Sequence, residues 1–336
     1  MNTKKYIKLY SLIGALLLMA HPSSAAGIYN NNASALNINA LTDTFATFAH
    51  NGEQLSDLFK SNSLYGTMTR IDEYGDDGST LPRNSFEQNS DFIFNNVWAD
   101  VKHINGHFHY DDAASPRGRF NMATLGVTTK SIDLKYGDIY FGGFAGYINS
   151  DIAHINTNGD HAGIFANYRL NKFDVTALTN IGSLNNNAEN ADFNNSWVNV
   201  ASDASVRINL DDTFIMRPAL YIGYTFVTSD DLLVNNDVVT SKDFNFLNIT
   251  PSVSFIKEIS KNWYGALSAK YVAHFGGDNK IYVANVKTDG IELDNHTDIG
   301  LDLEHNFKHF VFGGKIHKQI GGIDGWSGDI NIKYVF

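Results

Sequence analysis

The feature that most constrains this chain is a succession of strand-like segments that starts near Phe92 and continues to the last residue. Each segment has roughly ten to fifteen residues, is rich in β-branched and aromatic side chains, and is bounded by turn residues. The segments are predicted at residues 93–104, 119–132, 137–149, 158–170, 172–184, 194–210, 213–228, 244–257, 261–275, 294–307, 308–318 and 326–336. These twelve strands, an even number, predict an all-β fold over residues 93–336.

Apolar and polar side chains alternate along these segments, which places them on opposite faces of a sheet. In the last segment Trp326 and Ile330 share one face, whereas Ser327, Asp329 and Lys333 share the other. The polar face carries charges of both signs in one segment after another. A soluble sandwich also alternates, but a charged face on strand after strand is typical of a barrel with a wet lumen and an apolar face in lipid.

The predicted connections alternate between short turns and longer loops, as in outer-membrane barrels with short periplasmic turns and longer extracellular loops. Short turns follow the even-numbered segments, at residues 133–136, 171, 211–212, 258–260 and 307–308. Longer loops follow the odd-numbered segments, at residues 105–118, 150–157, 185–193, 229–243, 276–293 and 319–325. A lipid-exposed strand edge leaves costly unpaired backbone groups, so the first and last strands must pair. The sequence therefore predicts a closed, 12-stranded antiparallel transmembrane β-barrel.

Residues 1–26 have the three parts of a secretory signal peptide. Lys4, Lys5 and Lys8 form the charged region, residues 9–20 are apolar, and small residues precede a cleavage site between Ala26 and Gly27. The apolar run is too short to span a bilayer as a helix. Cleavage changes the formal net charge from −11 to −14 and implies that the protein leaves the cytoplasm.

Residues 27–92 form a polar N-terminal segment that precedes the barrel. A helix-like stretch spans about residues 33–60, where Leu41, Phe45 and Phe48 recur at roughly helical spacing. Residues 72–91 read as a loop linker, because Asp76-Asp77-Gly78 and Pro82 are turn residues. This segment is too polar to build a core of its own.

Composition excludes several classes of function. The chain has no Cys, so disulfide frameworks and Cys-ligated metal sites are excluded. Its acidic balance argues against nucleic-acid binding, which needs a basic surface. No motif indicates a catalytic residue, a cofactor or a resident metal, and we expect none of them.

Three groups of motifs in the predicted barrel resemble the C-terminal translocator domain of autotransporters, the type V secretion proteins. Val97–Val101 is similar to the first barrel strand, and Gly142–Tyr147 with Gly163–Tyr168 is similar to the Gly-rich third and fourth strands. Gly325–Gly328 followed by Tyr334–Phe336 is similar to the closing strand. The resemblance covers about 240 residues from Asn96 onward, which is near the family's domain length.

The resemblance implies a location in the outer membrane of a Gram-negative bacterium, with lipid as the barrel's surroundings. It implies that the periplasmic barrel-assembly machinery reads the terminal aromatic Phe336, with Tyr334, Ile332 and Ile330 on the same face. Periplasmic chaperones would deliver the chain, and we expect a monomer. The family also threads a helix through the pore, for which residues 33–60 are the matching candidate.

The resemblance further implies that the barrel translocates or displays the segment that precedes it. Family members export passengers of hundreds of residues, whereas 66 residues separate Gly27 from the first predicted strand. We therefore expect display of a short N-terminal segment and no enzymatic activity. Two alternatives stay open, namely a passive small-solute channel of the porin type and a surface adhesin that uses the extracellular loops.

Five charged residues are candidates for the lumen: Asp100, Arg169, Arg207, Arg217 and Lys270. They would pair with the pore helix, set ion selectivity, or simply be solvated by a wet interior.

Other clusters offer weaker alternatives. His103, His107 and His109 share a strand face next to Asp111 and Asp112 and have metal-ligand chemistry, but a solvated extracellular loop explains them. Asp and His residues at the predicted outer rim, such as Asp294 and His296, supply the residue types of a surface protease. Acidic loops supply the same types by chance.

Overall fold

The computed structural model describes residues 94–109, 117–152, 155–188, 191–211, 213–229, 232–234, 237–241, 243–276, 281–283, 286–288 and 294–336. The signal peptide, the cleavage site at Ala26 and Gly27, and the predicted pore helix lie outside these residues. None of the described residues forms a helix long and apolar enough to cross a membrane.

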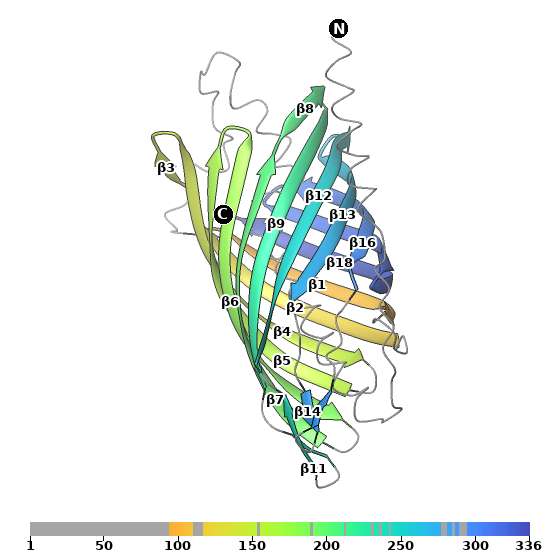
Figure 1. The fold of residues 1–336 in the computed structure, drawn as a ribbon. Coiled ribbons are helices and arrows are strands. Elements are labelled where there is room, and N and C mark those ends of the chain that lie inside the picture. Colours follow the sequence, from red (N-terminus) through yellow and green to blue (C-terminus); the bar gives the residue numbers. More distant parts are fainter. Residues whose placement is uncertain are drawn as a thin grey trace.

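Twelve long antiparallel strands form a ring (Figure 1). Each strand pairs with its neighbour along the chain, and β9 pairs directly with β12. The ring strands are β1 (Phe94–Phe108), β2 (Arg117–Thr129), β4 (Gly137–Ile152), β5 (Ile155–Leu170), β6 (Phe173–Ala188), β7 (Ala191–Val206), β9 (Phe214–Ser229), β12 (Phe244–Ser260), β13 (Trp263–Gly276), β16 (His296–Phe307), β17 (Phe310–Gly321) and β18 (Ile323–Val335).

The ring is closed by pairing of β1 with β18. Their register runs without interruption from Asn96 opposite Val335 to Phe108 opposite Ile323. Closure satisfies the backbone groups of both terminal strands, which an open sheet would expose to lipid. The prediction of a closed 12-stranded antiparallel barrel is confirmed.

Short strands extend both ends of the barrel. β3 (Ile132–Leu134) and β8 (Ile208–Asp211) lengthen the hairpins that join β2 to β4 and β7 to β9. At the opposite end, β10 (Leu232–Val234), β11 (Asp237–Ser241), β14 (Ile281–Val283) and β15 (Val286–Thr288) form a separate four-stranded sheet (Figure 1). We name the first end, with β3, β8 and the tight turns, the turn end, and the second, with β11 and β14, the loop end.

Three connections at the turn end are two-residue hairpins, since Leu170 pairs with Phe173, Ser260 with Trp263 and Phe307 with Phe310. Each contains one residue with positive φ, which are Asn171 (48°), Asn262 (64°) and Lys308 (54°). Tight hairpins need this left-handed conformation, and Asn tolerates it better than other residues with side chains.

The β8–β9 turn uses side-chain hydrogen bonding instead. The backbone N–H and the hydroxyl of Thr213 donate to Asp211 Oδ1 at 2.7 and 3.0 Å. These bonds lower the pKa of the exposed Asp211 carboxyl.

Strand positions agree with the sequence prediction, but several predicted loops are wrong. Most of residues 150–157, 185–193 and 319–325 belongs to the paired ends of β4 to β7, β17 and β18. Residues 105–108, also predicted as loop, continue β1. The predicted segment 194–210 is divided at Arg207 into β7 and β8. Hydrogen bonding therefore continues beyond the apolar part of these strands, into residues whose polarity suggests loops.

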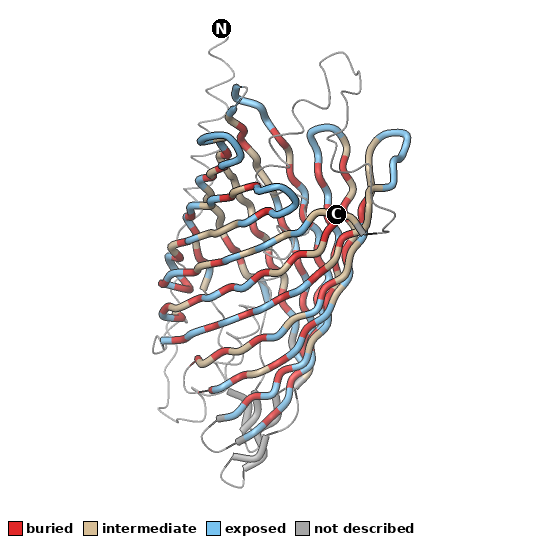
Figure 2. The backbone as a smooth tube through the Cα atoms, turned by 180° about the vertical axis from the view of Figure 1, so that it is seen from behind, coloured by how far each residue is buried: buried red, intermediate tan, exposed pale blue. Residues whose placement is uncertain are grey.

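Side chains alternate along each strand between the lumen and the outer surface, as the red and pale blue segments of Figure 2 show. Ile330 is 72% exposed, whereas its neighbour Asp329 is buried. The exposed set is apolar on every side of the barrel and includes Val101, Leu125, Ile164, Ile181, Val200, Ile222, Leu267, Leu301 and Ile316. This inside-out distribution confirms the predicted faces, with apolar residues toward lipid and polar residues toward the lumen.

Candidate functional site: the lumen of the barrel

One half of the lumen wall is lined by aromatic rings that lie flat on glycines of the neighbouring strand. Trp98 of β1 is opposite Gly126 of β2, and Trp197 of β7 is opposite Gly182 of β6. A Cβ atom built on Gly182 would lie 2.5 Å from Trp197 Nε1. The same arrangement recurs in Phe165 on Gly142, Phe144 on Gly163 and His161 on Gly146.

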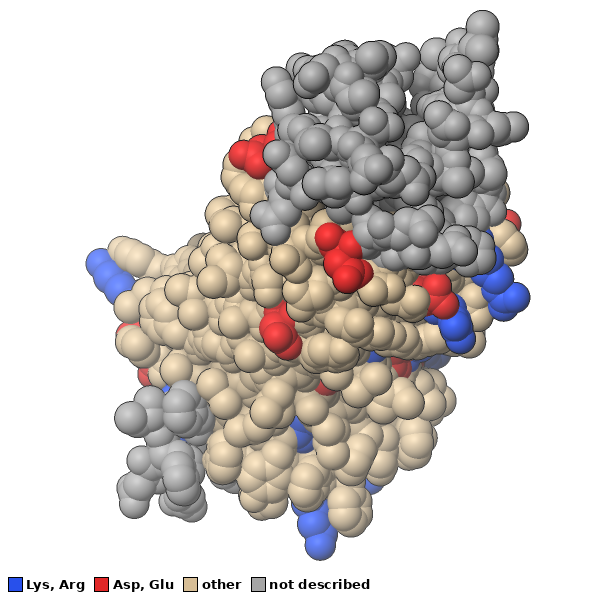
Figure 3. Space-filling model, turned by 90° about the horizontal axis from the view of Figure 1, so that it is seen from below, with Lys and Arg blue, Asp and Glu red and all other residues tan. Residues whose placement is uncertain are grey.

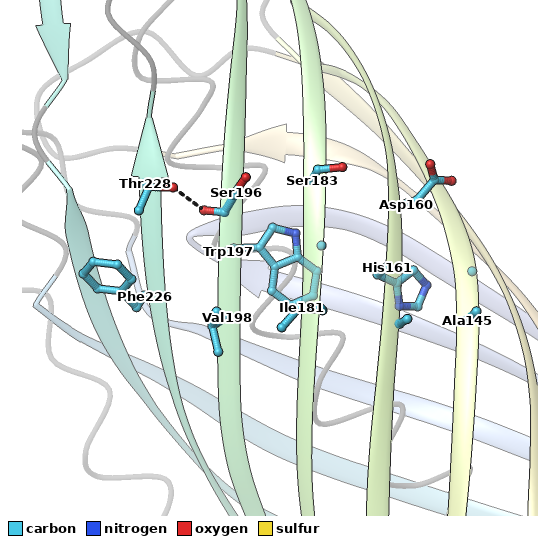
Figure 4. Close-up of a pocket in the computed structure, with 13 residues that line it drawn as sticks. Ala145, Asp160, His161, Ile181, Ser183, Ser196, Trp197, Val198, Phe226 and Thr228 are labelled. Carbon is cyan, nitrogen blue, oxygen red and sulfur yellow. Dashed lines mark hydrogen bonds between the residues drawn. The ribbon is translucent and has the colours of Figure 1, made fainter.

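The close-up in Figure 4 shows this arrangement. The Trp197 ring reaches from β7 toward β6, and the His161 ring reaches from β5 toward β4. Because glycine carries no side chain, each ring can pack against the backbone of the neighbouring strand. The rings thereby bury apolar surface inside the ring of strands β1 to β9.

The outer side of the same strands is hollowed by a depression of about 830 Å³. Ala145, Ala162, Ile181, Val198 and Phe226 follow one another across it in register. Asp160, Ser183, Ser196 and Thr228 line it one step nearer the loop end, where Thr228 donates to the carbonyl oxygen of Ser196 at 3.3 Å (Figure 4). The apolar row marks the edge of the lipid-facing surface on this side.

Amide and hydroxyl side chains form short ladders between the aromatic rings in the lumen. Thr157 donates to Asn186 Oδ1 at 2.8 Å, and Asn186 donates to Asn195 Oδ1 at 2.6 Å. Asn199 donates to Thr225 Oγ1 at 2.7 Å. Such cross-strand bonds satisfy buried polar groups without using charged side chains.

A buried ion cluster lies in the lumen at the turn end. Arg169 Nε donates to Asp174 Oδ1 at 2.8 Å, and Arg207 Nε lies 3.5 Å from Asp174 Oδ2. Arg169 also donates to Tyr140 Oη at 2.8 Å, and Arg207 donates to the carbonyl oxygen of Asn171 at 2.8 Å. One carboxylate therefore holds two guanidinium groups from different strands, which fixes β4 to β7 against one another.

The other half of the wall carries a row of alternating charge. Asp302 is opposite Lys315, Lys315 is opposite Asp329, and Asp329 is opposite Lys102. The row crosses β16, β17, β18 and β1, and Lys102 is only 1% exposed. Directly opposed charges of opposite sign stabilise neighbouring strands.

Nearer the loop end, basic groups of β13 and β16 surround Asp298. Lys270 Nζ lies 3.4 Å and His296 Nε2 3.7 Å from its carboxylate. The His296 ring stacks on His274 with 5.7 Å between centroids, and His274 Nδ1 lies 2.6 Å from Asn248 Oδ1. The lumen is therefore asymmetric, with an aromatic and amide half and a charged half.

The five lumen charges proposed from the sequence fall into different groups. Asp100, Arg169 and Arg207 are buried on the inner face, and Arg169 and Arg207 share Asp174. Lys270 pairs with Asp298, and Arg217 is half-buried on β9. The five candidate lumen charges did not include Lys102, Asp174 or Asp298, although the same alternation places all three on the polar face.

The C-terminal residues form an outward-facing aromatic group at the turn end. Tyr334 makes edge contacts with Phe310 and Phe336, at centroid distances of 5.0 and 5.2 Å. The backbone N–H of Phe336 donates to the carbonyl oxygen of Asn95 at 3.0 Å. Ile330, Ile332 and Tyr334 are all exposed on the same face. A role for these residues in barrel assembly stays a prediction.

The histidines considered as metal ligands lie on β1 or directly after it. His103 and His107 are exposed on the outer face, and His103 Nδ1 lies 2.7 Å from Asn121 Oδ1. Among the described residues, no three His, Cys, Asp or Glu side chains come together as a metal site. His296, considered for a protease at the outer rim, is instead buried in the lumen wall. Asp111 and Asp112 lie outside the described residues.

The geometry agrees with a comparison to known families. The profile described as Autotransporter beta-domain matches residues 97–314, which is more than half of the chain. The chain belongs to this family. No curated protein matches the sequence.

Solved autotransporter barrels share this fold at low sequence identity. The transport unit of the autotransporter AIDA-I from Escherichia coli has a TM-score of 0.63 and 14% identity, covering 82% of this chain and 98% of that one. The translocator domain of autotransporter NalP from Neisseria meningitidis has a TM-score of 0.57 and 13% identity, covering 83% of this chain and 99% of that one. The beta domain of the Bordetella autotransporter BrkA has a TM-score of 0.59 and 13% identity, covering 72% of this chain and 100% of that one. The resemblance noted in the sequence is thereby confirmed, and this autotransporter β-domain is an outer-membrane barrel in contact with lipid.

Proposed function

We propose that this barrel translocates or displays residues 27–92, the segment that precedes it in the same chain. The observation that carries the proposal is a closed ring whose inner wall carries aromatic rings and amide ladders on one half and opposed charges on the other. The charged half offers partners of both signs to a segment inside the ring. Neither half contains a group of residues with an evident catalytic role, and we propose that the activity is not enzymatic.

The proposal extends to biogenesis and orientation. A signal peptide cleaved between Ala26 and Gly27 would direct the chain to the periplasm, where chaperones and the barrel-assembly machinery receive it as a monomer. The aromatic group around Phe336 is the proposed recognition signal. The turn end faces the periplasm and the loop end faces outward, because short turns are periplasmic in such barrels.

The absence of native cysteine makes the topology directly measurable. Single cysteines at Ser34, Lys308 and Asn187 would be tested in intact cells with a membrane-impermeant maleimide. Display predicts labelling of Ser34→Cys and of the loop-end control Asn187→Cys, with the turn-end control Lys308→Cys protected until the outer membrane is opened. Protection of Ser34→Cys together with Lys308→Cys would contradict surface display.

Planar-bilayer conductance separates translocation from a passive channel. The mature chain from Gly27 would be compared with a chain that starts at Ser90. A quiet mature chain and a conducting truncation are expected if the N-terminal segment occupies the lumen. Equal, steady conductance from both chains would favour the passive channel. A separate result, attachment to host surfaces that depends on the loops and occurs without display of the N-terminal segment, would favour the adhesin.

A further inference from the structure

Basic side chains gather on one sector of the outer surface at the loop end. Lys318 is opposite Trp326, Trp326 is opposite Asn105, and Asn105 is opposite Arg119, so the four follow one another across β17, β18, β1 and β2. One step further toward the loop end, His107 is opposite Arg117. We name this sector the basic strip, formed by Lys318, Trp326, His103, His107, Arg117 and Arg119.

The strip differs from the rest of the circumference. Among the described residues of the ring strands, the only Lys or Arg side chains that face outward at the loop end are those of Lys318, Arg117 and Arg119. On β5 to β7 the corresponding outward positions are amide, hydroxyl or acidic, namely Asn158, Asp160, Ser183, Asn185, Asp192 and Asn194. In Figure 3, which views the barrel from the loop end, most of the described surface is uncharged, and Lys and Arg side chains lie at its edges. On the described ring strands, outward-facing Lys and Arg at the loop end are therefore confined to one sector.

The strip lies directly above the apolar surface. On β1, Val101 lies two positions nearer the turn end than His103, and on β2, Leu125 lies four positions nearer the turn end than Asn121. Ile316 and Ile330 continue the apolar surface on β17 and β18, and both are exposed. Alternate residues of a tilted strand are separated by less than about 7 Å, so Lys318 lies one level from Ile316. Arg119 and Arg117 lie six and eight residues from Leu125 toward the loop end, on the headgroup side of the apolar surface.

The cations of the strip have few contacts among the described residues. Arg119 Nη2 donates to Asp151 at 3.0 Å, while its side chain is 62% exposed. Arg117 Nε donates to the amide oxygen of Asn105 at 3.3 Å, and Lys318 contacts Asp324. Among the described residues, two carboxylates thus face three permanent cations and two histidines, and each guanidinium carries five N–H groups. The described part of this sector therefore carries more cationic than anionic groups.

Trp326 adds the remaining element of a lipid contact. Its indole is 55% exposed in the same cross-strand row as Lys318 and Arg119, and Lys318 Nζ lies 5.8 Å from the ring centroid. Trp is favoured at membrane interfaces because one part of the ring is apolar and its N–H is polar. Arginine forks match phosphate oxygens in paired hydrogen bonds.

We propose that the basic strip binds the phosphorylated headgroup of an outer-leaflet lipid, with Arg117 and Arg119 on phosphate and Trp326 at the start of the acyl chains. The proposal rests on the proposed orientation of the loop end toward the outside. Binding would anchor the β1–β18 closure to the surrounding leaflet. It does not depend on whether the barrel displays its N-terminal segment.

The test measures lipid binding by the purified full mature chain in detergent, using native mass spectrometry. The probes are diphosphorylated lipid A and the same lipid after removal of both phosphates. We expect preferential retention of the phosphorylated form and at least a tenfold weaker affinity for the Arg117→Gln/Arg119→Gln variant. The matched control is Lys172→Gln/Lys257→Gln, which removes two cations near the turn end and should leave affinity unchanged.

Three outcomes would overturn the proposal. The first is equal binding of the phosphorylated and the dephosphorylated lipid, and the second is an equal loss of affinity in the control variant. The third is full competition by millimolar inorganic phosphate, which would show that the strip recognises free phosphate and not a lipid. Heat-modified mobility on gels verifies that each variant is folded. The Trp326→Leu variant, which keeps all charges, is expected to weaken binding without altering the preference for phosphate.

Discussion

Gly126 tests whether the lumen wall depends on glycines beneath aromatic rings. In Gly126→Ala, the new Cβ would come within 2.6 Å of Trp98 Cη2 and closer still to Cζ2 and Cε2. β2 is hydrogen-bonded to β1 and β4 on its two sides, so the backbone cannot withdraw. The Trp98 ring must therefore leave the wall.

The magnitude follows from two opposing effects. Replacing a strand glycine by alanine normally stabilises by about 0.5–1 kcal/mol, because the unfolded chain loses freedom. Overpacking a well-filled site costs about 1–3 kcal/mol. Gly143 of β4 is the matched control, since a Cβ there meets only the carbonyl oxygen of Gly163, at 3.5 Å. We expect Gly143→Ala to be neutral or stabilising and Gly126→Ala to be destabilising, about 2 kcal/mol apart.

The assay is equilibrium unfolding in urea of the barrel in lipid vesicles, followed by tryptophan fluorescence. A double-mutant cycle with Trp98→Ala isolates the contact, and a coupling of about 1–3 kcal/mol is expected. Equal free energies of unfolding for the two alanine variants would refute the reasoning. So would a Gly126→Ala penalty that persists in full after Trp98 is removed.

Three further predictions use other parts of the barrel. Asp174→Asn removes the carboxylate between Arg169 and Arg207 and should cost about 3–5 kcal/mol in urea unfolding, because it leaves buried charge uncompensated. Asp151→Asn, at the exposed pair with Arg119, should cost less than about 1 kcal/mol by the same measurement. Leu125→Arg places a charge in the lipid-facing surface and should cost about 2–4 kcal/mol, whereas Asn121→Arg, nearer the loop end, should be close to neutral. Lys308 in the β16–β17 turn has a left-handed backbone conformation, which Asn adopts with less strain than Lys. Lys308→Asn should therefore raise the midpoint of urea unfolding. An unchanged or lower midpoint would show that the turn is unstrained.

The sequence predicted well which face of a strand each side chain occupies, because successive residues of a strand point to opposite faces. Once Trp326 and Ile330 are assigned outward, Asp329 and Lys333 have to face the lumen. The same rule correctly grouped His103 with His107. It could not show that His107 lies in a paired strand, because polar residues beyond the apolar surface resemble a loop.

Register was not available from the sequence, and most of the lumen depends on it. Asp329 lies between Lys315 and Lys102 only because β17, β18 and β1 align at that level. The contact of Trp98 with Gly126 likewise requires the exact partner on β2. Alternation specifies which side a residue faces, but a shift of two residues along a neighbour would preserve every face and change every partner.

Closure of the ring between β1 and β18 has a consequence for the order of events during biogenesis. These strands are the farthest apart in sequence within the ring, so β1 keeps one unsatisfied edge until the final strand has been synthesised and delivered. A product that stops early is an open sheet with two adhesive edges, prone to add strands from other chains. The thirteen residue pairs between β1 and β18 can form only when both strands are present, so hydrogen bonding itself distinguishes a complete ring from a truncated one.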